Sequence, residues 1–123
     1  MLGGAFRTDL PTYVSGVAGS TDAERAEQGS EWEERGAHSV KLHLGQGVEA
    51  DLATVDAVMT AAPSLRVAVD AHRAYSVTDG LRLARGLAER GAWFLEAPLA
   101  PEDVAGHAHL VDRAEIPIAI GED

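Results

Sequence analysis

Residues 65–90 read LRVAVDAHRAYSVTDGLRLARGLAER and contain one complete strand-and-helix unit. The almost continuous apolar run at 65–71 is typical of a parallel strand that is covered on both faces. Ser76 is a favourable N-cap, and the apolar residues that follow it gather on one side of a 3.6-residue period, with charged residues on the other. We therefore predict a strand at 65–71 and a helix at 76–90.

The same alternation extends in both directions from this unit. Apolar runs predict further strands at 12–15, 39–44, 93–97 and 117–121, and helical patterns predict helices at 22–35, 48–62 and 101–113. Thr21 and Pro101 mark two of the helix starts. Strands that alternate with helices in this way are typical of an α/β fold built on a parallel sheet. No linker divides the chain, so we expect one structural block.

The composition limits the classes of partner. A formal charge of −10, carried mostly by acidic residues that we expect on the surface, argues against nucleic acid and against an anionic membrane. No apolar run approaches the roughly 20 residues that span a bilayer, so we expect a soluble, cytoplasmic protein. Because the chain has no cysteine, a metal ion would need oxygen or imidazole ligands, which favours hard cations such as Mg²⁺.

Three acidic residues follow apolar runs at a constant spacing. Asp70, Glu96 and Glu122 are separated by 26 residues each time, which is about one strand-and-helix unit. Since the carboxyl ends of parallel strands lie at one edge of the sheet, we expect these carboxylates to converge. Their repulsion would raise their pKa values, and a divalent cation with oxygen ligands, such as Mg²⁺, would relieve it. Alternatively, they are ordinary polar strand ends.

The strand predicted at 39–44, SVKLHL, contains the only lysine of the chain. Lys41 and His43 are two residues apart, so they lie on the same face of the strand. A lysine inside an apolar strand suggests a chemical role, although it could simply extend its ammonium to a nearby acid. His43 could likewise be a buried structural histidine.

Five segments resemble the mandelate racemase and muconate-lactonizing branch of the enolase superfamily: PTYVSG at 11–16, SVKLHLG at 39–45, VAVDAHRAY at 67–75, WFLEAPL at 93–99 and IPIAIGED at 116–123. The resemblance implies a (β/α)₈ TIM-type barrel with a separate capping domain. Residues 1–123 would then form the N-terminal half of the C-terminal barrel domain, about the first four βα units plus a fifth strand. The capping domain and the later strands would be absent, and we expect this piece alone to be inactive.

The resemblance also implies site roles. Asp70, Glu96 and Glu122 would ligate Mg²⁺, which binds the substrate carboxylate and stabilises the enediolate formed when a base removes the adjacent carbon-bound proton. Lys41 would lie close to the substrate carboxylate. Relatives commonly carry Lys-x-Lys here, so His43 would take the position of the second lysine as the base. No residue is assigned to an organic cofactor.

His72 is a second departure, because many relatives carry asparagine two residues after the first ligand. A histidine there could protonate a leaving hydroxyl, so we expect a lyase: a hydro-lyase that dehydrates a sugar acid, an aldonate or aldarate. A racemase, epimerase or cycloisomerase of the same superfamily is the alternative. We expect the full-length enzyme to be a homo-oligomer.

The remaining histidines, at 38, 107 and 109, are expected to face solvent.

A dinucleotide-binding module is the rival interpretation. The segment GQGVEA at 45–50 follows a predicted strand, opens a predicted helix and fits G-x-G-x-x-A, with Asp70 at the end of the next strand. Glu49 argues against it, because it falls in the turn where a pyrophosphate would lie. The rival also leaves Lys41, His43 and the two glutamates unexplained.

Overall fold

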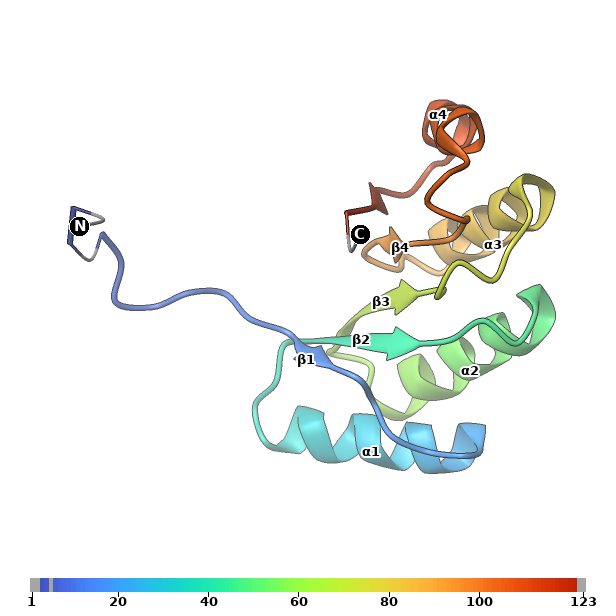
Figure 1. Ribbon diagram of the computed structural model, residues 1–123. Helices are drawn as coiled ribbons and strands as arrows, with labels where there is room; N and C mark the ends of the chain where they lie inside the picture. The colour runs from blue at the N-terminus through green and yellow to red at the C-terminus, as the bar shows by residue number, and fades with distance from the viewer. Residues whose placement is uncertain (1–2, 5, 122–123) are drawn as a thin grey trace.

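The computed structural model describes residues 3–4 and 6–121. These residues form five strands and four helices in strict alternation, and the helices follow one another around one side of a curved sheet (Figure 1). In chain order the elements are β1 (Val14–Ser15), α1 (Asp22–Glu34), β2 (Ser39–His43), α2 (Val48–Ala61), β3 (Arg66–Asp70), α3 (Val77–Glu89), β4 (Leu95–Glu96), α4 (Val104–Arg113) and β5 (Ile118–Ala119).

The sheet has the strand order β1-β2-β3-β4-β5, and every neighbouring pair is parallel. Each helix therefore returns the chain to the strand next to the one it left. This sequential order is that of a (β/α) barrel, whereas a doubly wound nucleotide-binding sheet reverses direction at a switch point. The predicted α/β fold class with successive βα units is confirmed, and the topology argues against the dinucleotide-binding interpretation.

The strands place their apolar and polar side chains on opposite faces. Val40 and Leu42 of β2, and Val67 and Val69 of β3, are buried in the core beneath the helices. Helix residues complete this core, among them Val55, Val58, Leu83 and Leu87. Because side chains alternate along a strand, Lys41 and Asp70 face the other side of the sheet. The face that packs against the helices forms the apolar core, and the opposite face carries the polar side chains of Lys41 and Asp70.

Two of the predicted helix starts are confirmed. Thr21 and Glu24 form a reciprocal capping box at α1, and the Ser76 hydroxyl accepts a hydrogen bond from the backbone of Asp79 at α3. The start predicted at Pro101 is wrong, because α4 begins at Val104. The Asp103 carboxylate caps that helix by accepting from the Gly106 amide. Residues 101–102 form a turn instead, and the Asp103 amide donates to the Ala100 carbonyl across it.

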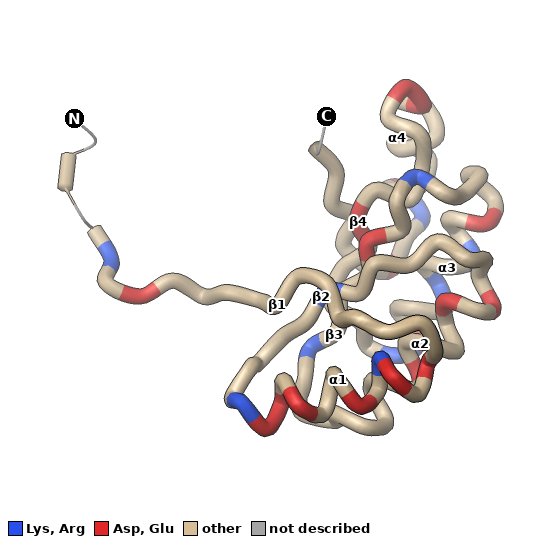
Figure 2. Tube along the Cα trace, turned by 60° about the horizontal axis from the view of Figure 1, so that its bottom comes forward, with Lys and Arg blue, Asp and Glu red and all other residues tan. Residues whose placement is uncertain are grey.

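The acidic residues are concentrated on the outer helices, as Figure 2 shows most clearly along α1. Six of the 20 acidic residues of the chain lie in that helix, whose sequence is DAERAEQGSEWEE. The last turn of α1 has no basic residue. Within the described residues, no helix is both long and apolar enough to cross a membrane.

Candidate active site

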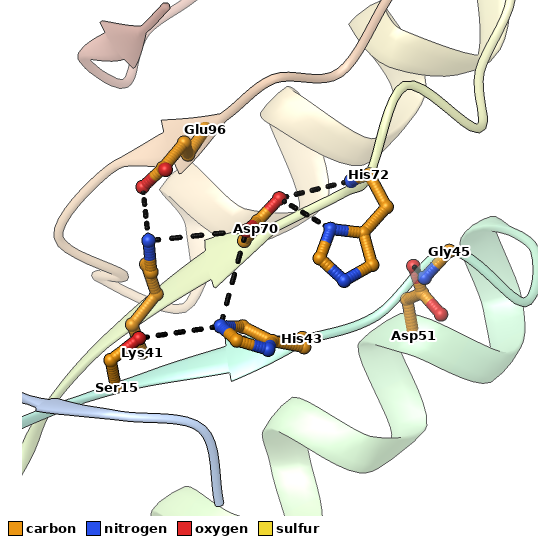
Figure 3. A network of polar contacts seen from close by, with 8 residues as sticks. All are labelled: Ser15, Lys41, His43, Gly45, Asp51, Asp70, His72 and Glu96. Atoms are coloured by element: carbon orange, nitrogen blue, oxygen red, sulfur yellow. Dashed lines mark hydrogen bonds and ion pairs between the residues drawn. The ribbon is translucent and has the colours of Figure 1, made fainter. Parts of the chain in front are cut away.

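Five of the predicted site residues, His72 among them, meet at the carboxyl edge of the sheet (Figure 3). Lys41 and His43 come from β2, Asp70 ends β3 and Glu96 ends β4. The strand register pairs His43 with Asp70 and Asp70 with Glu96, so equivalent strand ends lie side by side. The prediction that the even spacing would bring these strand ends together is confirmed for the described residues.

Lys41 lies between the two carboxylates. Its Nζ donates a hydrogen bond to Glu96 Oε2 at 2.7 Å and lies 3.9 Å from Asp70 Oδ2. Burial opposes the charge of the ammonium, but the hydrogen bond to Glu96 and the charges of Glu96, Tyr13 and Asp70 outweigh it and raise the pKa of Lys41. Lys41 therefore stays cationic, and its pairing with a nearby acid agrees with the simpler of the two sequence interpretations.

Asp70 is only 2% exposed and faces both histidines. Its Oδ1 accepts a hydrogen bond from the His72 amide at 3.0 Å and lies 3.1 Å from His72 Nδ1. Its Oδ2 lies 3.9 Å from His43 Nε2. The two imidazole rings are 5.1 Å apart between centroids, and their side chains are 41% and 54% exposed. His43 is therefore not a buried structural histidine, and both rings can reach a small molecule at this edge.

The backbone after β3 folds His72 back toward Asp70. His72 and Arg73 have φ angles of 48° and 63°, a left-handed conformation that costs non-glycine residues energy. Hydrogen bonds to the neighbouring strand end hold this turn, since the Ala71 amide donates to the Glu96 carbonyl and the Arg73 amide to the Ala97 carbonyl. The imidazole is thus presented by a strained turn that its surroundings fix.

The third predicted ligand, Glu122, lies outside the described residues. In the described part of the chain, no group of three or more histidine or acidic side chains is arranged to hold a metal ion. Asp70 and Glu96 nevertheless offer hard oxygen donors from adjacent strands, and the ammonium between them shows that their combined charge attracts a cation. This donor chemistry fits Mg²⁺, and the structure describes two of the three proposed carboxylate ligands.

One histidine prediction is wrong. His38 and His109 are exposed as expected, but His107 is buried on the inner face of α4 beside Gly106 and Leu110. Its Nδ1 lies 2.9 Å from the Asp103 carbonyl. The position three residues before the apolar Leu110 could have indicated this burial, because residues at i and i+3 share a helix face.

The glycine-rich turn at 45–47 does not have free amides for a pyrophosphate. The Asp51 carboxylate accepts hydrogen bonds from the amides of Gly45 at 2.8 Å and Gln46 at 3.0 Å, and the Gly47 amide donates to the Tyr75 hydroxyl at 3.2 Å. A buried anion in this position would also repel phosphate. The dinucleotide-binding interpretation is therefore wrong. Sequence reasoning missed both Asp51 and Tyr75.

Comparison with known families agrees with this geometry. A family model described as enolase C-terminal domain-like matches residues 23–123. The chain belongs to the enolase superfamily. Within that superfamily it falls in the mandelate racemase and muconate-lactonizing branch, as the sequence motifs indicated. Enolase-superfamily members with similar structures are TIM-barrel enzymes, so the five strands and four helices correspond to part of such a barrel.

Three relatives illustrate the range of this superfamily. The D-galactarolactone cycloisomerase of Agrobacterium fabrum is 34% identical over 127 residues, covering 99% of this chain and 34% of the relative. The arabinonate dehydratase of Saccharolobus solfataricus is 27% identical, covering 97% of this chain and 33% of the relative. The crystal structure of a Streptomyces coelicolor A3(2) racemase with bound magnesium is 28% identical, with a TM-score of 0.83, over 92% of this chain and 32% of the racemase. The chain thus spans about a third of the length of these relatives.

Proposed function

We propose that the chain supplies one wall of a Mg²⁺-dependent active site that removes the proton next to the carboxylate of a sugar acid and then eliminates water. The observation that carries this proposal is the convergence of Lys41, His43, His72 and Glu96 around Asp70 at one sheet edge. This arrangement combines a fixed cation, paired carboxylates and two accessible imidazoles. Dehydration after α-proton abstraction needs a base and an acid, which two histidines can supply.

Asp70 and Glu96 would hold the metal, and we propose Glu122 as the third ligand. When bound, Mg²⁺ would supply Lewis-acid stabilisation of the negative charge that develops on the substrate carboxylate. The magnesium in the related racemase structure supports this assignment. Asp70 is held in place by the His72 amide, and Glu96 by its hydrogen bond from Lys41, so both carboxylates are oriented by the protein.

Lys41 would bind the substrate carboxylate. Its ammonium is buried, stays protonated and is hydrogen-bonded to Glu96. The cation is therefore already fixed in position and largely free of water before a substrate binds. The negative charges of Asp70 and Glu96 would otherwise oppose the approach of a substrate carboxylate, with only the metal to offset them. Lys41 thus lowers the cost of bringing a third anion to this edge.

His43 and His72 would move the protons. His43 Nε2 would accept the α-proton, and the electron pair of that C–H bond would form a carbon–carbon double bond as the β-hydroxyl leaves. His72 would donate the proton that makes the departing group water. Asp70 Oδ1, 3.1 Å from His72 Nδ1, would stabilise the protonated ring before the transfer. Both rings are accessible, as proton transfer to a bound substrate requires.

A cycloisomerase or racemase is the second candidate. The 34% identity to a galactarolactone cycloisomerase favours a sugar-acid substrate but a different outcome after the shared proton abstraction. In that case His43 would still remove the α-proton, and His72 would not be needed as an acid for a leaving hydroxyl. A racemase would also need a second group, on the opposite face of the substrate, to return the proton. The 27% identical arabinonate dehydratase supports the elimination instead.

We further propose that residues 1–123 act as the N-terminal half of a barrel domain within a longer polypeptide, and that they are inactive alone. The remaining barrel strands and a capping domain would close the site and select the substrate. The complete enzyme would be a cytoplasmic homo-oligomer. The length of the relatives, about three times that of this chain, supports the longer polypeptide.

The test uses the complete protein with a panel of aldonates, aldarates and galactarolactone, beginning with arabinonate. Proton NMR in D₂O follows both loss of the α-proton signal and formation of a 2-keto-3-deoxy product. We expect Mg²⁺-dependent dehydration that EDTA abolishes. Exchange or isomerisation without dehydration would favour the second candidate, and the absence of any Mg²⁺-dependent change across the panel would refute both.

A further inference from the structure

Asp51 is a buried acid that the proposed chemistry does not use. It lies in the first turn of α2 and is only 1% exposed. Its carboxylate accepts hydrogen bonds from the amides of Gly45 and Gln46 and from the Tyr75 hydroxyl. Three donors and the positive end of a helix stabilise this buried charge. Figure 3 shows the carboxylate beside the Gly45 amide, close to the loop that carries His72.

Tyr75 connects this carboxylate to two further loops. Its hydroxyl donates to Asp51 Oδ2 and accepts a hydrogen bond from the Gly47 amide at 3.2 Å, while its own amide donates to the Pro98 carbonyl at 3.0 Å. Burial and the hydrogen bond to Asp51 both raise the pKa of the Tyr75 phenol. The phenol therefore stays a donor, and the loops after β2, β3 and β4 are joined through one residue, by its side chain to Asp51 and Gly47 and by its backbone amide to Pro98.

The two histidines lie at these loops: His43 is the last residue of β2, directly before the first loop, and His72 lies in the second. His43 precedes Gly45 by two residues, and His72 precedes Tyr75 by three. The loops also touch closely, because a Cβ added to Gly45 would lie 3.1 Å from both the Ala71 carbonyl oxygen and the Ala74 Cβ. A change that separates the two loops would therefore move His72 away from the end of β2, where His43 lies.

We infer that Asp51 and Tyr75 form a clamp that fixes the relative positions of His43 and His72 across Asp70. The effect of this clamp on turnover rests on the proposed function. Its effect on the positions of the two rings is independent of that function. Among the described residues, the hydrogen bonds of Asp51 and Tyr75 go to neither imidazole, so we assign them as positioning residues. The clamp also keeps the strained turn at His72 and Arg73 in place, because the Tyr75 ring is anchored just beyond it.

The experiment replaces Tyr75 by phenylalanine in the complete protein, which removes the hydroxyl and keeps the ring. Thr60→Ala is the matched control, since it removes a hydrogen-bonded hydroxyl from the exposed side of α2, away from the carboxyl edge. Histidine-selective ¹⁵N and ¹³C labelling then follows the ring resonances of His43 and His72 and the nuclear Overhauser effect between the rings. Thermal unfolding of both variants is measured alongside.

We expect Tyr75→Phe to shift both ring resonances and weaken the ring-to-ring effect at least about twofold, while Thr60→Ala leaves both unchanged. Where arabinonate is turned over, kcat should fall roughly 10- to 100-fold with KM changed less than about threefold, because small misplacements of catalytic groups are costly. Unchanged histidine spectra in a Tyr75→Phe protein with a lower unfolding temperature would overturn the inference. Asp51 and Tyr75 would then contribute to stability alone.

If the Tyr75→Phe protein does not fold, a second measurement on the unmodified protein tests the clamp instead. In the unmodified protein, the Gly45 and Gln46 amides should exchange with D₂O at least about 10-fold more slowly than unprotected loop amides, because Asp51 accepts from both. Fast exchange at both positions would refute the clamp. A shifted histidine spectrum in a protein without turnover on any sugar acid would refute the proposed function and preserve the clamp.

Discussion

The buried ion pair between Lys41 and Glu96 can be measured by a double-mutant cycle of Lys41→Met, Glu96→Gln and the combined variant. The Nζ–Oε2 distance is 2.7 Å, and the two side chains are 9% and 19% exposed. With an effective dielectric constant of about 20, Coulomb's law gives an attraction of about 6 kcal/mol. In Glu96→Gln, the amide oxygen can still accept from Lys41 and Asp70 stays close to the ammonium, so we expect a smaller coupling free energy of about 2 kcal/mol.

Chemical denaturation in the presence of EDTA supplies the four free energies of unfolding. Arg90 and Asp56 provide a matched control, because their shortest contact is also 2.7 Å but their side chains are 28% and 54% exposed. We expect that pair to couple by at most about 1 kcal/mol. A Lys41–Glu96 coupling no larger than the control would show that burial does not strengthen this pair, and would contradict the idea of a preorganised cation.

The same pair predicts the pH dependence. Because the pKa of Lys41 is raised in the folded protein, the ion pair contributes its full stabilisation below the ordinary lysine value of 10.5. That contribution is lost as the pH rises above 10.5 and through the folded-state pKa. The difference in unfolding free energy between the unmodified protein and Lys41→Met should therefore shrink at the alkaline end, and a constant difference would contradict this assignment.

Three further predictions concern the ligands, the proposed acid and a helix cap. Glu96→Gln should abolish Mg²⁺ binding in isothermal titration calorimetry of the complete protein, and retained binding would exclude Glu96 as a ligand. His72→Asn should keep Mg²⁺ binding and α-proton exchange but lose dehydration, so unchanged dehydration in the NMR assay would exclude His72 as the acid. Thr21→Ala should lower the unfolding free energy by about 1 kcal/mol, because it breaks the capping box with Glu24; an unchanged denaturation midpoint would show that the cap contributes nothing.

The sequence predicted the elements well because their signals are local. The apolar run at 65–71 and the period of 76–90 identify β3 and α3 without knowledge of their neighbours. The meeting of Asp70 and Glu96 was also predictable, since equal spacing in successive βα units places equivalent residues at one edge. The start of α4 was not, because Pro101 and Asp103 are both good helix-opening residues and only the observed Gly106 hydrogen bond distinguishes them.

The clamp could not be predicted, because it depends on how two loops approach each other. A glycine-rich turn before a helix exposes several amides, and this local pattern is the same whether an external phosphate or an internal carboxylate binds them. In this chain the acid at position 51 lies one turn into the helix, close enough for its carboxylate to reach back to the amides of Gly45 and Gln46. A buried acid at that position in a similar turn therefore indicates that the amides serve the fold, and that an anion-binding group must be sought elsewhere on the sheet edge, where we propose Lys41.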